Sequence, residues 1–158
     1  MKSVYLETTI PSYLAAKPSG DLVTAAHQKI THDWWEKRRA DFALFVSQAV
    51  VREARRGDPD AAQRRLGFLQ DVTRLRVSTK AIQLAKAFQS SIRILRNAEA
   101  DSIHLAVATL NRLDYVLTWN CRHLANGEVQ SAADALVVQS SLKIPQMRTP
   151  EELLYGDD

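Results

Sequence analysis

The chain has 158 residues, 46% of them hydrophobic, so it has the length of one domain and can bury roughly two-thirds of the surface of its unfolded form. Its 21 basic and 18 acidic residues leave a net charge of +3, which permits nucleic-acid binding without requiring it. The single cysteine, Cys121, excludes an internal disulfide framework, and no run of about 18 apolar residues is present to span a membrane. Because the acidic Glu7 interrupts the region where a signal peptide needs apolar residues, we expect a cytoplasmic protein.

Helix and strand patterns alternate along the chain, which is typical of an α/β fold. The apolar run at 4–6 predicts the first strand. Thr9 would cap a short helix through residue 16, and Asp21 would cap a longer helix toward residue 38. These two helices would form an αα-hairpin.

Residues 41–47 predict a second strand, and their nearly continuous apolarity favours burial on both faces of a sheet. The next pattern, at 48–56, is helical and ends at Gly57. Asp58 would cap the following helix, with Pro59 at its first position.

Residues 72–77 predict a short edge strand, and Ser78 or Thr79 would cap a helix toward residue 92. Asn97 would cap the helix at 98–113, which is amphipathic. Its buried stripe is expected to contain Ile103, Ala106, Val107, Leu110 and Leu113.

Residues 115–119 predict another buried strand. Two helix-like stretches follow it, at 122–126 and 129–141. Near the end, Thr149 and Pro150 precede two glutamates, an order that predicts one short terminal helix. No linker separates these elements, so we expect a single domain over 1–158.

Four polar residues lie beside these apolar elements and are the candidate site. Glu7 follows the first strand and Asn120 ends the strand at 115–119, while Glu53 and Asp101 lie in predicted helices. In open α/β sheets, ligands bind at the carboxyl ends of the strands, so a parallel sheet would bring these residues together. Carboxylate and carboxamide oxygens without a cysteine or histidine cluster suit Mg²⁺ or Mn²⁺ better than Zn²⁺.

Four motifs, read together, resemble the PIN-domain family over nearly the whole chain. The block around Asp101, followed about twenty residues later by the strand that ends at Asn120, is the most specific part. The motifs are VYLETTIPSY at 4–13, the helix that holds Glu53, ADSIHLA at 100–106 and LTWN at 117–120.

The resemblance implies a three-layer fold, in which helices flank a central, mostly parallel sheet of about five strands. It also implies a Mg²⁺- or Mn²⁺-dependent endoribonuclease, of the kind found as VapC-type toxins of type II toxin–antitoxin pairs. By the same resemblance we expect an RNA substrate, a cognate antitoxin and a homodimer. Trp34 and Trp35 are interpreted either as helix packing or as part of a partner surface.

Carried over by position, the resemblance assigns the family's acidic positions to Glu7, Glu53, Asp101 and Asn120. Two of these residues depart from the commonest pattern. Glu7 stands where the family usually has aspartate, and its extra methylene would shift the carboxylate by about an ångström. Asn120 keeps an oxygen ligand but removes one negative charge, which favours one metal ion over two tightly bound ions.

The expected mechanism is metal-assisted hydrolysis of an RNA phosphodiester. Glu7 and Asp101 would hold the cation directly or through its waters, and Glu53 would orient a water or complete the outer shell of ligands. Asn120 would position a water on the cation. Thr118 lies two residues before Asn120, so strand alternation places both on one face and makes its hydroxyl a further catalytic candidate.

Each candidate also has a structural interpretation. Glu53 could pair with Arg52 or Arg56 on the helix surface, and Asp101 could simply complement the dipole at a helix N-terminus. His104 is interpreted as a helix histidine with satisfied hydrogen bonds, and the same caution applies to His123. Cys121 is expected to pack as a small apolar residue, and Thr9 to cap a turn.

Basic residues that flank the predicted pocket are candidates for contacts to RNA phosphates. Arg93, Arg96 and Arg122 are the best candidates by sequence position. Two rival classes stay open: a catalytically silent PIN-like module that binds RNA or a protein partner, and an unrelated doubly wound protein such as a phospho-acceptor receiver. A receiver would require an aspartate as phosphate acceptor, whereas this chain has Glu7 at the first strand end.

Overall fold

The computed structural model describes residues 1–155 of the chain. Within these residues a five-stranded sheet has the order β3-β2-β1-β4-β5, and every neighbouring pair is parallel. This architecture confirms the predicted α/β fold with a central parallel sheet. The strands are β1 (Lys2–Leu6), β2 (Phe42–Ser47), β3 (Thr73–Leu75), β4 (Tyr115–Leu117) and β5 (Gln146–Arg148).

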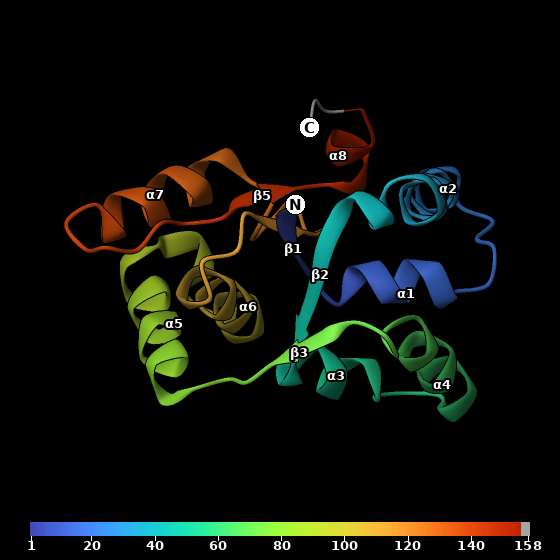
Figure 1. Ribbon diagram of the computed structural model, residues 1–158, viewed down its shortest axis with the longest axis horizontal. Helices are drawn as coiled ribbons and strands as arrows, with labels where there is room; N and C mark the ends of the chain where they lie inside the picture. Colours follow the sequence, from blue (N-terminus) through green and yellow to red (C-terminus); the bar gives the residue numbers. More distant parts are fainter. Residues whose placement is uncertain (156–158) are drawn as a thin grey trace.

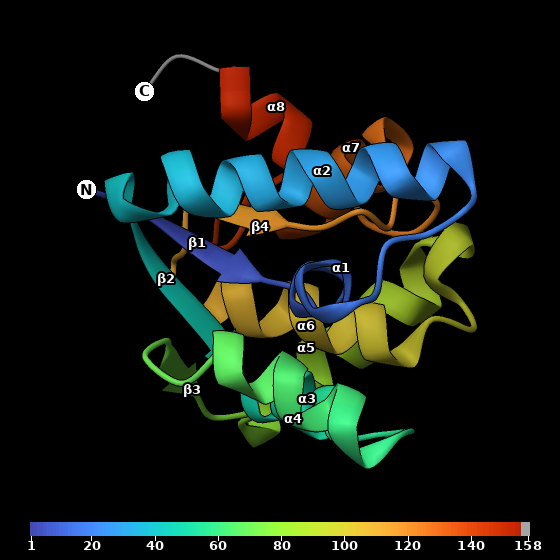
Figure 2. The same cartoon turned by 90° about the vertical axis from the view of Figure 1, so that its right-hand side faces the viewer.

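Helices lie on both sides of the sheet, with α5, α6 and α7 gathered on one side and α1, α2 and α4 on the other (Figure 1). The expected pairing of the first two helices is present, because α1 packs against α2 (Figure 2). None of the helices in residues 1–155 is long and apolar enough to cross a membrane. The helices are α1 (Thr9–Ala15), α2 (Leu22–Lys37), α3 (Gln48–Ala54), α4 (Pro59–Phe68), α5 (Thr79–Ser91), α6 (Glu99–Leu110), α7 (Gly127–Val137) and α8 (Pro150–Tyr155), with 3-10 turns η1 (Arg39–Asp41) and η2 (Arg93–Leu95).

Three of the predicted helix caps are confirmed. The side chains of Asp21, Asp58 and Ser78 each accept a hydrogen bond from a backbone N–H in the first turn of α2, α4 and α5 respectively. The predictions for Thr9 and Asn97 are wrong. Thr9 lies inside α1, where its hydroxyl bonds to Glu7, and α6 begins after Ala98 without a side-chain cap.

Several element boundaries differ from the sequence-based predictions. The strand expected at 72–77 is reduced to β3, and the strand expected at 115–119 ends at Leu117 because the chain then turns through the site. Residues 122–126 form turns and not a helix, and β5 was not predicted from its residues. Cys121 is exposed in the same turn, so its expected packing role is wrong.

Helix α6 is buried more completely than an amphipathic stripe predicts. Leu105 to Ala108 are fully buried, as is His104, because α5 covers the face of α6 that a one-sided helix would leave to solvent. Of the expected stripe, Ala106, Val107 and Leu113 are buried and Ile103 and Leu110 are partly buried. The consequence is that any polar side chain on α6 must find a partner inside the protein.

The order of the strands reverses between β1 and β4, and this point determines where a site can form. From β1 the chain crosses to β2 and β3 on one side, and later to β4 and β5 on the other. Leu6 pairs with Leu117 in the parallel register, so the residues that follow these two strands emerge side by side. Such switch points are where ligands bind in open α/β sheets.

Two glycines, one just before α4 and one inside it, provide a matched test of the fold. Gly57 has a φ of +84°, so an alanine side chain at this position would be strained, and we expect Gly57→Ala to lower the free energy of unfolding by about 1–2 kcal/mol. Gly67 lies in α4 with open space around a Cβ, so Gly67→Ala should raise it by about 0.5–1 kcal/mol. Urea unfolding of both variants measures these values, and changes of the same sign would contradict the described backbone.

Candidate active site at the strand ends

Glu7 lies at the centre of the candidate site, directly after β1. Its backbone N–H donates to the carbonyl of Leu117 at 3.0 Å, and this bond extends the β1–β4 ladder by one step. The side chain is only 4% exposed. Its Oε1 accepts hydrogen bonds from the hydroxyls of Thr9 and Thr118, each at 2.6 Å, and its Oε2 accepts from the Thr9 N–H at 3.2 Å.

The Glu7 carboxylate is difficult to ionise. Burial raises its pKa above the ordinary value, and the charge of Asp101 adds to this, although the charge of His104 and the two threonine hydroxyls oppose it. Across residues 1–155, no lysine or arginine forms an ion pair with Glu7. Any positive charge that enters the site would therefore stabilise the ionised form of Glu7.

Glu53 projects from α3 and is held by two donors. Its Oε1 lies 2.5 Å from Nε2 of His104 and accepts a hydrogen bond from the Thr8 hydroxyl at 2.9 Å. The surface pairing with Arg52 or Arg56 that the sequence left open is not formed as an ion pair, and Arg56 acts on Glu53 only through its charge. Burial opposes ionisation, but the hydrogen bond and charge of His104, the Thr8 hydroxyl and the charge of Arg56 together outweigh it and lower the pKa of Glu53.

His104 is buried in α6 and connects Glu53 to the sheet. Its Nδ1 lies 2.6 Å from the hydroxyl of Tyr5, which lies 2.7 Å from the hydroxyl of Ser47. The Ser47 oxygen also accepts from the backbone N–H of Ala49. Burial works against protonation of His104, yet the bond to Glu53 and the charge of Glu7 raise its pKa overall. In either protonation state, Nε2–H can donate to Glu53 and hold that carboxylate in place.

Asp101 lies in the first turn of α6 and forms the other half of the site. Its Oδ2 accepts from the Asn120 side-chain amide at 3.0 Å and lies 2.9 Å from Nδ1 of His123. Asn120 in turn accepts from the backbone N–H of His123 at 3.0 Å. The backbone N–H of Asn120 donates to Thr118 at 2.9 Å, so the Thr118 hydroxyl joins the Asp101 side of the site to Glu7.

Aromatic contacts fix the chain between Thr118 and Asn120. The Trp119 ring stacks on His27 of α2, with ring centroids 4.0 Å apart, and its indole N–H donates to Thr31 at 2.7 Å. Its backbone N–H donates to the Thr9 hydroxyl at 2.9 Å. These contacts anchor the residue next to Asn120 to two helices, so the position of Asn120 is determined by the core and not by a free loop.

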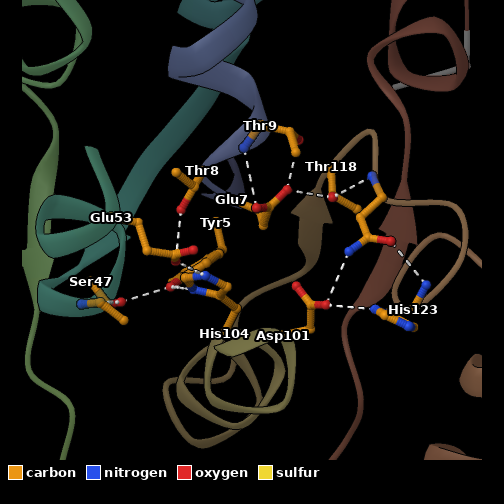
Figure 3. A network of polar contacts seen from close by, with 12 residues as sticks. Tyr5, Glu7, Thr8, Thr9, Ser47, Glu53, Asp101, His104, Thr118 and His123 are labelled. Atoms are coloured by element: carbon orange, nitrogen blue, oxygen red, sulfur yellow. Dashed lines mark hydrogen bonds and ion pairs between the residues drawn. The ribbon is translucent and has the colours of Figure 1, made fainter. Parts of the chain in front are cut away.

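The structure thus brings five predicted site residues together at the carboxyl ends of the strands, in a polar network of two hydrogen-bonded groups, one around Glu53 and one that joins Glu7 to Asp101, as Figure 3 shows for most of its members. These residues are Glu7, Glu53, Asp101, Thr118 and Asn120. It does not place the predicted arginines there, because Arg93 and Arg96 are exposed around η2 and Arg122 is exposed in the turn after Asn120.

Sequence reasoning missed four members of the network: Tyr5, Ser47, His104 and His123. His104 does have satisfied hydrogen bonds, as interpreted, but one of its partners is the catalytic candidate Glu53. The sequence offers one sign that His104 belongs to the site: it follows Asp101 by three positions, so the two side chains lie on the same face of the helix. The partner of His104 lies 51 residues earlier in the chain, which the spacing cannot reveal.

The donor atoms of this network suit a hard cation, but no ready-made cage is present. In residues 1–155, no group of three or more histidine, cysteine, aspartate or glutamate side chains is arranged to hold a metal ion. Mg²⁺ is commonly held by one or two carboxylates, with waters and substrate phosphates completing its shell. Glu7 and Asp101 fit that pattern, because the charge of Asp101 acts on Glu7 and Glu7 lacks an ion-pair partner, whereas Glu53 is engaged by His104.

Known structures with this fold were found by structural comparison, although no protein-family model and no curated protein matches the chain. VapC20 of Mycobacterium tuberculosis, described as a toxin that cleaves the sarcin-ricin loop, is similar with a TM-score of 0.58 and 16% identity, over 72% of this chain and 87% of that one. VapBC2 of Rickettsia felis, bound to a DNA fragment from its promoter, is similar with a TM-score of 0.56 and 13% identity, over 92% and 97%. The resemblance to PIN-domain toxins is thereby confirmed for the fold.

Replacing Glu7 by glutamine should stabilise the protein at neutral pH. The raised pKa of Glu7 in the folded state means that the wild type loses stability as pH rises above about 4.3, the ordinary value for an unfolded glutamate. The glutamine side chain keeps an oxygen for the two threonine hydroxyls and cannot ionise, so we expect a gain of about 1 kcal/mol at pH 7. Urea unfolding at pH 4 and pH 7 with a chelator present measures this, with the exposed Glu36→Gln as control. A Glu7→Gln variant no more stable than that control at pH 7 would contradict the account.

Removing the Tyr5 hydroxyl should weaken the support of Glu53. Tyr5→Phe deletes the oxygen between Ser47 and His104 and leaves both buried groups short of a partner, so we expect a loss of about 1–3 kcal/mol in unfolding free energy. The matched control is Tyr115→Phe, because the Tyr115 hydroxyl makes no hydrogen bond within residues 1–155. Equal unfolding midpoints for the two variants would show that the Tyr5 bridge contributes nothing.

Proposed function

We propose that this protein is a metal-dependent endoribonuclease that hydrolyses RNA phosphodiester bonds in the cytoplasm. The observation that carries the proposal is the gathering of Glu7, Glu53 and Asp101 at the switch point between β1 and β4, each fixed by its own polar donors. A structure described as a cleaving toxin has the same fold, which supports the assignment. A preorganised acidic site suits phosphodiester hydrolysis, because it would hold a divalent cation where negative charge develops on the attacking and leaving oxygens.

In the proposed mechanism, Glu7 and Asp101 are the residues that would hold Mg²⁺ or Mn²⁺ beside the RNA phosphate. The bound cation would supply charge stabilisation at the phosphate and would acidify a water for attack. Asn120 and His123 hold the Asp101 carboxylate in one orientation, and Thr118 does the same for Glu7.

Glu53 has a separate role in this proposal. Because His104 and Thr8 occupy its Oε1, its Oε2 is the atom that can orient a water toward the phosphate. His104 acts through Glu53 and is therefore a positioning residue. A lowered pKa keeps Glu53 ionised, as an acceptor for that water's proton requires.

We further propose that the protein is the toxin of a type II toxin–antitoxin pair, with a cognate antitoxin and a homodimeric state. The support is the likeness to VapC20 and to VapBC2 from Rickettsia felis. Trp35 is partly buried on α2 and is a candidate for a partner surface, whereas Trp34 is completely buried and belongs to the core.

The second candidate is a silent PIN-like module that binds RNA without cutting it. Two observations favour it: the missing negative charge at Asn120 and the absence, within residues 1–155, of three acidic or imidazole ligands around one point. The two candidates make opposite predictions for RNA cleavage.

A cleavage assay separates them. Purified protein is incubated with a mixed RNA pool in Mn²⁺, Mg²⁺ or chelator. We expect metal-dependent cutting, and a loss of about a hundredfold or more for Asp101→Asn, because several kcal/mol of charge stabilisation disappear. The control is Asp134→Asn, an exposed aspartate of α7.

Cutting that continues in chelator, or that is equal in the two variants, would refute the proposed mechanism. Tight RNA binding without cleavage in either metal would instead establish the silent module. Circular dichroism of each variant verifies that it is folded.

A further inference from the structure

A group of arginines without ion-pair partners in the described part of the chain lies beside the candidate site, at the end of α3 and on β3. Arg52, Arg55 and Arg56 lie within five positions of one another, and all three are exposed. Arg74 is exposed on β3, next to α3 (Figure 1). Within residues 1–155, none of the four forms an ion pair with a carboxylate.

Two hollows of the surface connect these arginines to Glu53. The first, of about 400 Å³, is lined by Glu53, Arg52 and Arg56 together with Asn97, Glu99 and the apolar side chains of Ala49, Ala100 and Ile103. The second, of about 390 Å³, is lined by Gln48, Val51, Arg52, Arg55 and Arg74. Arg52 lines both hollows, so they lie side by side on the surface, and we call the two together the path; its first hollow includes Glu53.

The lining of this path becomes more positive from the first hollow to the second. The first hollow contains two carboxylates, Glu53 and Glu99, as well as its arginines. The second hollow has three arginines and no acidic residue in its lining. Only Arg52 lies within α3, whereas Arg55 and Arg56 follow its last residue, where the helix dipole favours positive charge. An anion in the path would supply a counter-charge to arginines that form no ion pair within residues 1–155.

From this geometry we infer that the path is the binding subsite for the single-stranded RNA that flanks the scissile phosphate. This inference rests on the proposed function, because it places the RNA strand relative to Glu53. The apolar side chains of the first hollow suit the face of a base, and its amide and arginine side chains suit base edges and phosphate. The three arginines of the second hollow contact successive phosphates as the strand leaves the site.

RNA fits this path better than an acidic protein segment does. The path opens at the carboxylate that would orient the attacking water, which is where a substrate strand must pass, and the apolar and amide side chains of its first hollow suit an uncharged base, which an acidic peptide lacks. The inference also replaces Arg93, Arg96 and Arg122 as the main phosphate contacts, since none of them lines either hollow.

The test measures RNA binding without cleavage. In the full chain with Asp101→Asn, three arginines of the second hollow are changed together, Arg52→Ala, Arg55→Ala and Arg74→Ala. Arg56 is left in place because its charge acts on Glu53. The control changes three exposed lysines outside both hollows, Lys80→Ala, Lys86→Ala and Lys143→Ala, and removes the same total charge.

Fluorescence anisotropy with a fluorescein-labelled single-stranded RNA gives the Kd over a series of KCl concentrations. Each lost phosphate contact should reduce the slope of log Kd against log salt by about 0.7, so we expect the arginine triple to reduce it by about 2 and the lysine triple to leave it nearly unchanged. Equal slopes for the two triples would overturn the inference, because net charge alone would then explain binding.

The outcome is independent of the nuclease proposal. If the wild type cuts no RNA but its binding depends on the arginine triple, the nuclease proposal fails and the RNA path stands. If the wild type cuts RNA and the arginine triple binds it with an unchanged slope, the path fails and the nuclease proposal stands.

Discussion

The parallel pairing of β1 with β4 is the constraint on which the site depends. It sets Leu6 opposite Leu117, and the N–H of Glu7 continues that ladder by donating to the Leu117 carbonyl. Once this register forms, the next side chains must meet, and the 2.6 Å bond from Thr118 to Glu7 is its direct result. A shift of one residue would turn Thr118 to the opposite face of the sheet and separate it from Glu7.

Burial in this pocket opposes the ionisation of the carboxylates, which the proposed function requires. Burial and the charge of Asp101 raise the cost of ionising Glu7, and the opposing contributions come from two threonine hydroxyls and the charge of His104 instead of lysine or arginine. In the proposed function a divalent cation would supply the missing positive charge to carboxylates that are already held in place. The free arginines lie outside the acidic pocket, where they can attract an RNA strand without displacing a metal ion.

The sequence predicted those parts of the site that depend on chain direction and strand periodicity. Glu7 and Asn120 follow buried strands, and a parallel sheet brings such positions to the same edge, so their proximity could be deduced. The role of His104 could not be deduced, because it depends on the packing of α3 against α6. This packing brings Oε1 of Glu53 to 2.5 Å from Nε2 of His104. Thr9 was misjudged for a related reason: a local cap competes with a bond to Glu7, and only the folded geometry decides between them.

The central claim is that Glu7 and Asp101 together hold a divalent cation. Titration of Mn²⁺ into the purified protein, followed by the electron paramagnetic resonance signal of the free ion, tests it most directly. We expect the wild type and the Asp134→Asn control to bind Mn²⁺ equally, and Glu7→Gln and Asp101→Asn each to weaken binding by at least about tenfold. Equal affinity in all four proteins, or no binding by the wild type, would contradict it.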